Sequence, residues 1–101
     1  MIYTLSNVSL SELCQLEGIE SDIVMEIVEY GIVEPIEGSC AENWIFEMSS
    51  VHWIKKALRL YQDLEIDWVA VALLIDLMQQ RESLQRENLR FQQQLQRFIQ
   101  Q

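Results

Sequence analysis

Apolar residues in the first third of the chain recur at helical spacing in two short segments. Ser9 and Glu12 have the S-x-x-E spacing of a capping box, in which each side chain accepts a hydrogen bond from the other residue's backbone N–H. This pattern predicts a first helix that ends at Gly18 and has an inward face of Leu10, Leu13, Cys14 and Leu16. A second helix is predicted to begin at Ser21 or Asp22, with an inward face of Ile23, Val24, Ile27 and Val28. Two short helices joined by a tight turn are typical of a helix-turn-helix.

Three short segments have strand-like patterns. The first is 2–5, near the start of the chain. The other two, 32–35 and 44–46, flank a loop that contains Gly, Ser and Asn, so they predict a small β-hairpin, or wing. Pro35 restricts the first strand of this hairpin to a sheet edge or to a very short ladder, because proline has no backbone N–H to donate.

Two longer helices are predicted in the second half. Ser49 and Ser50 are expected to cap a third helix, with one face formed by Val51, Ile54, Leu58 and Tyr61. Asp67 is expected to cap a fourth helix, which opens with the apolar run 68–75. A helix that is apolar around most of its circumference must be covered on more than one side.

The fourth helix then continues as an imperfect heptad repeat of about three repeats. Leu77, Leu84, Phe91 and Phe98 are each seven residues apart, with Leu74 and Leu95 at the companion position, which Arg81 and Asn88 interrupt. One chain cannot bury such a seam alone, so we expect a coiled coil in a homodimer. The predicted dimerisation residues are Trp68, Leu74, Leu77, Leu84, Phe91, Leu95 and Phe98. Two interpretations of Trp68 remain open here: a residue of the protomer core, or a brace against the second copy.

The charge is distributed unevenly. The chain has a formal net charge of −9, and residues 1–47 contain ten acidic residues with no lysine or arginine. From residue 48 onward there are six acidic and seven basic residues. Such a chain repels nucleic-acid phosphates and anionic membranes and favours basic protein surfaces. The longest apolar run, eight residues from Trp68 to Ile75, is also too short for a bilayer, which needs about 20. We therefore expect no direct nucleic-acid or membrane partner.

No motif in the sequence predicts catalysis, a metal site or a cofactor. Cys14 and Cys40 form no CxxC pair, and His52 has no neighbour of a metal-ligand type. We interpret Cys14 as a small buried hydrophobe, Cys40 as an exposed thiol of the wing loop, and His52 as a surface or half-buried residue. Two cysteines without a signal peptide are typical of a reducing cytoplasm. The sequence thus favours a cytoplasmic protein that is not an enzyme.

The order of the elements resembles the MerR-type winged-helix superfamily: two helices, a wing, a third helix and a helix with a coiled-coil tail. A closer resemblance is to the chaperone-modulatory proteins of the CbpM type. The segments that carry it, in order, are 12–14, 18–19, 26–28, 31–35, 44–46, 57–60, 67–68, 77–78, 87–88 and 97–98. The resemblance implies a mainly α, MerR-like winged helix-turn-helix over 1–66, followed by a dimerisation unit with a coiled-coil tail over 67–101.

The same resemblance implies a function. Proteins of the CbpM type bind and inhibit a DnaJ-like co-chaperone, the curved-DNA-binding protein A, and the J-domain of such a co-chaperone carries a basic helix that meets Hsp70. An acidic surface that covers this helix would compete with Hsp70. The predicted partner-binding residues are Glu12, Leu16, Glu17, Glu20, Asp22, Met25, Glu26 and Glu29, with Tyr30 a further apolar candidate. The acids are interpreted as steering and rim contacts, and the apolar residues as buried anchors.

Other interpretations remain open at the level of sequence. The acids are equally consistent with a solvated face, since charge alone does not separate the two. A MerR-like DNA-binding transcription regulator is the first alternative function, although the first two helices and the wing contain no basic residue with which to neutralise phosphates. A structural adaptor that acts only through its coiled coil is the second.

Overall fold

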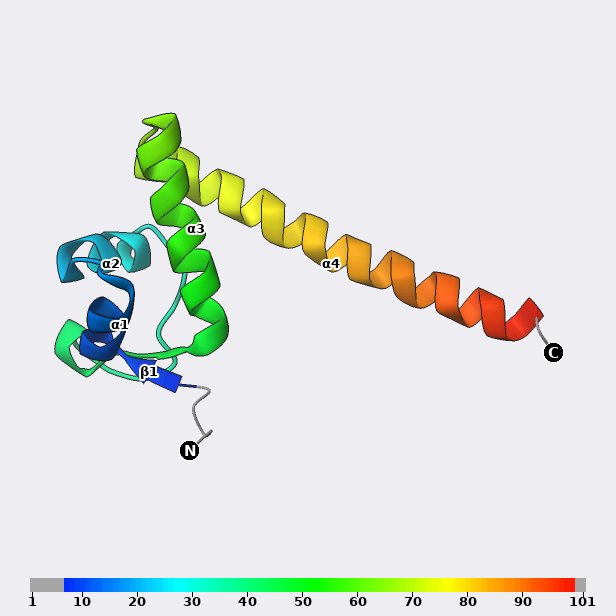
Figure 1. The fold of residues 1–101 in the computed structure, drawn as a ribbon, viewed down its shortest axis with the longest axis horizontal. Coiled ribbons are helices and arrows are strands. Elements are labelled where there is room, and N and C mark those ends of the chain that lie inside the picture. The colour runs from blue at the N-terminus through cyan, green and yellow to red at the C-terminus, as the bar shows by residue number, and fades with distance from the viewer. Residues whose placement is uncertain (1–6, 100–101) are drawn as a thin grey trace.

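The computed structural model describes residues 7–99, which form four α-helices, one short 3-10 helix and two short strands (Figure 1). The elements follow the order β1 (Asn7–Ser9), α1 (Leu10–Glu17), α2 (Ser21–Glu29), η1 (Ala41–Asn43), β2 (Ile45–Glu47), α3 (Met48–Leu64) and α4 (Trp68–Ile99). The strand expected at 2–5 lies outside the described residues.

Local signals set the bounds of the first two helices. The capping box is present: Glu12 N donates to Ser9 Oγ at 3.2 Å, and Ser9 N donates to Glu12 Oε1 at 3.0 Å. Gly18 ends α1 in the left-handed conformation, with φ 66°, where a residue without Cβ avoids a steric cost. The start of α2 at Ser21 is as predicted. The inward position expected for Leu16 is wrong, because this side chain is 71% exposed.

The small sheet is antiparallel, as expected, but its first strand is not the expected one. β2 pairs with β1, in the register Asn7 with Glu47 and Ser9 with Ile45. Residues 32–35 form no strand; Ile32 and Val33 instead bury their side chains in the core. The wing loop pairs with β2 just after this segment, where Ile36 N donates to Ile45 O at 2.8 Å and Ile45 N donates to Glu37 O at 3.1 Å.

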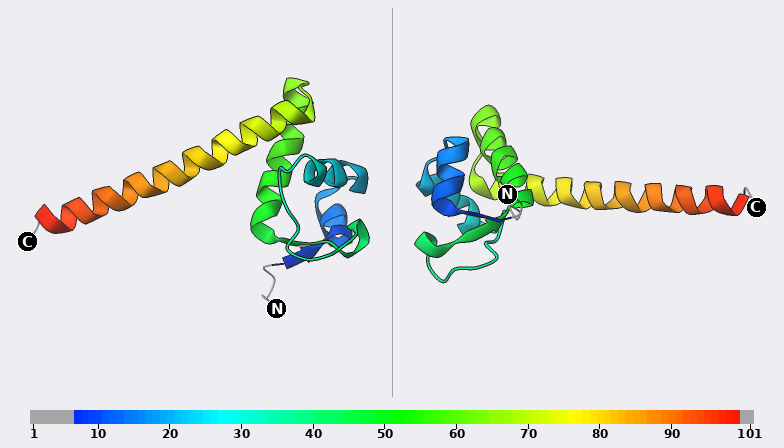
Figure 2. Two further views of the ribbon diagram at one scale, coloured as in Figure 1. Left: turned by 180° about the vertical axis from the view of Figure 1, so that it is seen from behind. Right: turned by 60° about the horizontal axis from the view of Figure 1, so that its bottom comes forward.

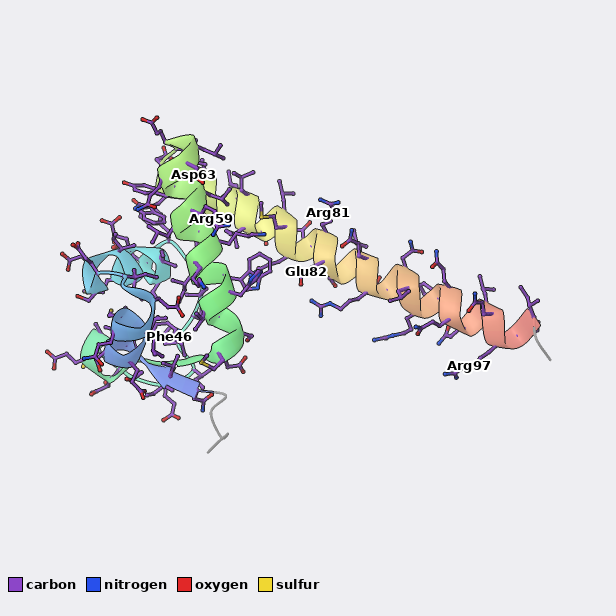
Figure 3. The ribbon with its side chains drawn as sticks, viewed as in Figure 1. Phe46, Arg59, Asp63, Arg81, Glu82 and Arg97 are labelled. Atoms are coloured by element: carbon purple, nitrogen blue, oxygen red, sulfur yellow. The ribbon has the colours of Figure 1, made fainter. Side chains whose placement is uncertain are left out.

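One hydrophobic core joins the sheet to all four helices. Phe46 of β2 is fully buried, and Figure 3 shows it near α1. Around it pack buried side chains from every helix, among them Leu13, Val24, Ile27, Ile54 and Val71. Trp44 and Trp53 are half-buried against this core.

The turn between α3 and α4 is compact. The predicted cap of α3 at Ser49 and Ser50 is wrong, because the helix already begins at Met48 and its N-cap residue is Glu47. Ser49 Oγ donates a hydrogen bond to the Glu47 carboxylate. α3 ends at Leu64, and its C-cap residue Glu65 is in the left-handed conformation, with φ 51°. Asp67 caps α4 as predicted, because Ala70 N donates to Asp67 Oδ1 at 2.9 Å. The rings of Tyr61 and Trp68 then stack across the turn at 4.1 Å.

α4 is one continuous helix of 32 residues. At about 1.5 Å per residue it is about 48 Å long. Its first turns pack on α3, and the rest projects away from α1, α2 and α3 as a single rod (Figure 2). Every residue from 80 to 99 is exposed in the protomer. The molecule accordingly measures 55 × 38 × 23 Å.

Candidate partner-binding surfaces

The outer face of α2 brings together four of the predicted partner-binding residues. Asp22, Met25, Glu26 and Glu29 follow the spacing i, i+3, i+4, i+7, which places them on one side of a helix. All four are exposed, and Met25 is 41% exposed. The opposite side of the same helix carries the buried residues Val24 and Ile27. We call the four residues the α2 outer face: three carboxylates around one flexible apolar side chain.

The other four predicted residues lie in three different places. Glu12 and Leu16 are one helical turn apart on the exposed side of α1. Glu17 is half-buried and forms an ion pair with Lys55 of α3 at 3.3 Å, so its charge is already partnered within the chain. Glu20 is the N-cap of α2. The structure therefore does not form the eight predicted residues into one patch.

A hollow of 580 Å³ lies between α1, the start of α2 and η1, and sequence reasoning did not find it. Leu10, Cys14 and Ile19 give it an apolar lining, since Leu10 and Ile19 belong to the core. Glu20 and Glu42 also line it, together with the polar side chains of Ser11, Gln15 and Ser21. Only the absence of basic residues from 1–47 hinted at this acidic setting, and nothing in the sequence placed Glu42 beside α1.

The pKa values of two titratable groups near these surfaces are shifted. Hydrogen bonds from the backbone and side chain of Ser9 hold the pKa of Glu12 below its ordinary value. Burial raises the pKa of the Cys14 thiol, as the apolar lining of the hollow would require. Cys14 is half-buried and Cys40 is exposed, as the sequence predicted for Cys40.

The basic residues nearest to these surfaces all lie on α3. Lys55 pairs with Glu17, while Lys56 and Arg59 form neither of the two ion pairs found in residues 7–99. Figure 3 shows Arg59 on α3, with Arg81 and Arg97 farther along the chain on α4. α1, α2, η1 and β2 carry no lysine or arginine. The helix-turn-helix therefore presents carboxylates at the positions where phosphate binding would need cations.

An apolar stripe runs along α4. Leu73 and Leu77 follow the buried residues Val71 and Ile75 by two positions each, so they point away from the protomer's own core. The stripe continues through exposed heptad residues, namely Leu84, Phe91, Leu95 and Phe98. Of the other predicted dimerisation residues, Leu74 is half-buried and Trp68 is only 6% exposed. The core interpretation of Trp68 is confirmed, and any part it has in dimerisation would be indirect.

Within residues 7–99 the structure contains no group of three or more His, Cys, Asp or Glu side chains that could hold a metal ion. Over the same span, no helix has the length and apolar character needed to cross a membrane.

The fold is that of a helix-turn-helix protein with a protruding C-terminal helix. Residues 8–93 match the family described as MerR HTH family regulatory protein. A relative named chaperone modulatory protein CbpM, from Pseudomonas putida strain KT2440, is 43% identical over 88 residues, which is 87% of this chain and 86% of the relative. Proteins of the same name from Citrobacter koseri and Salmonella arizonae are 34% and 33% identical over 91 residues, 90% of this chain and 89% of each relative. The chain belongs to the CbpM family of MerR-like helix-turn-helix proteins, and its expected fold is confirmed.

Proposed function

We propose that this protein is a non-catalytic chaperone modulator that binds the J-domain of a DnaJ-like co-chaperone and restrains its action on Hsp70. Family membership supports the modulating role, since the relatives are named chaperone modulatory proteins. The observation that carries the J-domain proposal is the α2 outer face, where three carboxylates surround Met25 without a basic residue among them. This face complements the basic helix that the resemblance assigns to the partner.

The charge of the module favours a basic protein over DNA. Winged-helix proteins that bind DNA neutralise several phosphates with lysine and arginine, and this term supplies most of their non-specific affinity. Here the second helix offers Asp22, Glu26 and Glu29 in that place. A duplex approaching α2 would be repelled, while a basic helix would be steered towards it. A transcription regulator is therefore the weaker proposal, even though the scaffold is shared.

Inhibition would follow from competition. A J-domain whose basic helix lies against α2 cannot present the same helix to Hsp70, so it cannot stimulate the ATPase. Rim carboxylates mainly raise the rate of association, and an apolar anchor lowers the rate of dissociation. Met25 lies between Asp22 and Glu29 along the α2 outer face and is suited to the second role, because its unbranched side chain adapts to varied surfaces. Such a role would be exercised in the cytoplasm.

We also propose that two copies dimerise through α4, using residues 67–101 as a dimerisation unit and 1–66 as the binding domain. The exposed stripe through Leu77, Leu84 and Phe91 supports this, because a row of large exposed apolar side chains along one side of a helix marks an interaction surface. Pairing two such stripes would bury them in a coiled coil.

Calorimetric titration with an isolated J-domain tests the partner. We expect saturable binding at 0.05 M salt that weakens steeply towards 0.5 M, because screening shortens the range of the carboxylate field. The same J-domain should stimulate Hsp70 ATPase less as this protein is added. An absence of binding heat at low salt would rule out the partner, and a salt-dependent gel shift with duplex DNA at micromolar protein would favour the regulator.

Sedimentation equilibrium tests the dimer. Replacing Leu84 and Phe91 with Asp should convert the dimer to a monomer, because each copy would bury two charges in the seam. The matched control replaces Ser83 and Gln93 with Asp, since these exposed residues lie outside the stripe. A wild-type protein that sediments as a monomer would refute dimerisation.

A further inference from the structure

The hollow between α1, α2 and η1 is distinct from the α2 outer face but adjoins it. Ser21 lines the hollow, and the next residue, Asp22, belongs to the outer face. The neighbouring segments 10–15 and 19–21 build the hollow together with residue 42, which is more than twenty residues farther along the chain. Its volume of 580 Å³ falls within the range of about 300–1,000 Å³ that is usual for binding pockets.

The lining determines what the hollow can accept. Leu10 and Ile19 are each less than a tenth exposed and form apolar walls, and the half-buried Cys14 of α1 also lines the hollow. Glu20 and Glu42 bring two carboxylates to the same hollow, and no lining residue is basic. An apolar side chain would gain from burial against the walls. A lysine or arginine beside it would gain from the two carboxylates.

We infer that this hollow is the anchor pocket for the J-domain: it takes an apolar side chain that is flanked by lysine or arginine on the partner's basic helix. The inference rests on the proposed function and adds to it the site of the buried contact. Energetically dominant residues of an interface sit in such pockets, while exposed charged rims contribute less. The carboxylates of the α2 outer face then steer the partner, and the hollow adds a second buried contact to that of Met25.

The two cysteines provide a matched test of the pocket. The chain contains only Cys14 and Cys40, so a Cys40→Ser variant carries its one thiol in the hollow, and a Cys14→Ser variant carries its one thiol in the wing loop. Each full-length variant is alkylated to completion with N-ethylmaleimide and titrated with the isolated J-domain. Alkylation of Cys14 fills the hollow and should weaken binding by about tenfold or more, the effect of losing an interface anchor. Alkylation of Cys40 should change the affinity less than about twofold, as expected outside an anchor site.

Protection of Cys14 from alkylation by the bound J-domain supplies a second readout. Saturating J-domain should slow the alkylation of Cys14 several-fold and leave the rate at the exposed Cys40 almost unchanged. If alkylation of Cys14 unfolds the protein, as thermal unfolding would reveal, the double variant Glu20→Gln/Glu42→Gln replaces it, because both side chains are exposed. That variant should bind about fivefold more weakly, from two exposed ion pairs lost. Its control, Glu34→Gln/Glu37→Gln, has the same net charge as the Glu20→Gln/Glu42→Gln variant and should bind the J-domain as tightly as the wild type.

The outcomes separate the two proposals. If the unmodified protein binds the J-domain but neither filling the hollow nor neutralising its two carboxylates weakens binding, the anchor pocket is refuted and the proposed function stands. If the unmodified protein does not bind the J-domain at all, the proposed function fails and the inference fails with it.

Discussion

Neutralising the α2 outer face tests the electrostatic part of the mechanism most directly. The triple substitution Asp22→Asn, Glu26→Gln and Glu29→Gln removes three charges and keeps similar shape and volume. All three side chains are exposed on one side of α2, and the core residues Val24 and Ile27 lie on the other. The variant should therefore fold normally. Its thermal unfolding should change only slightly, because Asp22 is the one acidic residue in the first turn of α2.

The expected loss of affinity follows from the exposure of the three carboxylates. An exposed ion pair contributes about 0.2–1 kcal/mol. Three such pairs lost together sum to about 0.6–3 kcal/mol, which corresponds to about 3- to 150-fold in Kd. Most of this loss should appear in the association rate, since rim charges act mainly by steering. In 1 M salt, where the screening length is about 3 Å, the difference from the wild type should nearly vanish.

Surface plasmon resonance with an immobilised J-domain separates the two rates. The matched control is Glu34→Gln, Glu37→Gln and Glu87→Gln, which removes the same charge from exposed positions away from α2. An α2 variant that binds within twofold of the wild type at 0.1 M salt would refute the role of this face. An equal loss in the control would show that net charge, and not the α2 outer face, attracts the partner.

The remaining predictions concern the fold. Phe46→Ala should destabilise the protein by about 3–5 kcal/mol in thermal unfolding, because it leaves a cavity at a fully buried site; a loss under 1 kcal/mol would contradict the core assignment. Trp68→Phe should keep the ring stack with Tyr61 and remove a buried indole N–H that has no partner within the described residues, so unfolding should change little despite the smaller side chain. Glu12 has a lowered pKa in the folded state because it accepts hydrogen bonds from Ser9, so its contribution to stability is complete above its unfolded-state pKa of about 4.3 and is lost as pH falls through the lower folded value. The loss of stability on acidification should therefore be smaller in Glu12→Gln, and denaturant melts at several pH values measure it.

The parts of the fold that sequence predicted correctly depend on short-range physics. The capping box, the left-handed glycine after α1 and the Asp67 cap each involve residues within four positions of one another. Their residue types are therefore sufficient to predict them. The apolar stripe along α4 could likewise be predicted, because a heptad repeat relates residues that are only three, four or seven positions apart.

The parts that sequence missed depend on contacts between distant segments. β2 found its partner in β1, about forty residues earlier, and not in 32–35, whose apolar residues were needed in the core. The choice between these two partner segments cannot be predicted from strand propensity, which reflects mainly how side chains pack on a half-buried surface. The hollow beside α1 was missed for the same reason, since Glu42 reaches it only through the folded wing loop. Leu16 was misassigned because a helix of eight residues has too few turns to fix its inward side from pattern alone.

The separation of inner and outer residues on α2 explains how a scaffold typical of DNA-binding proteins can serve a basic protein partner. Val24 and Ile27 fix the position of the helix in the core, and their packing is independent of the side chains at positions 22, 25, 26 and 29. Reversing the charge of that outer face therefore costs the fold little, while it changes the sign of the field that an approaching partner meets. The helix-turn-helix supplies a rigid, exposed helix, and the outer side chains alone decide whether a polyanion or a basic protein can approach it.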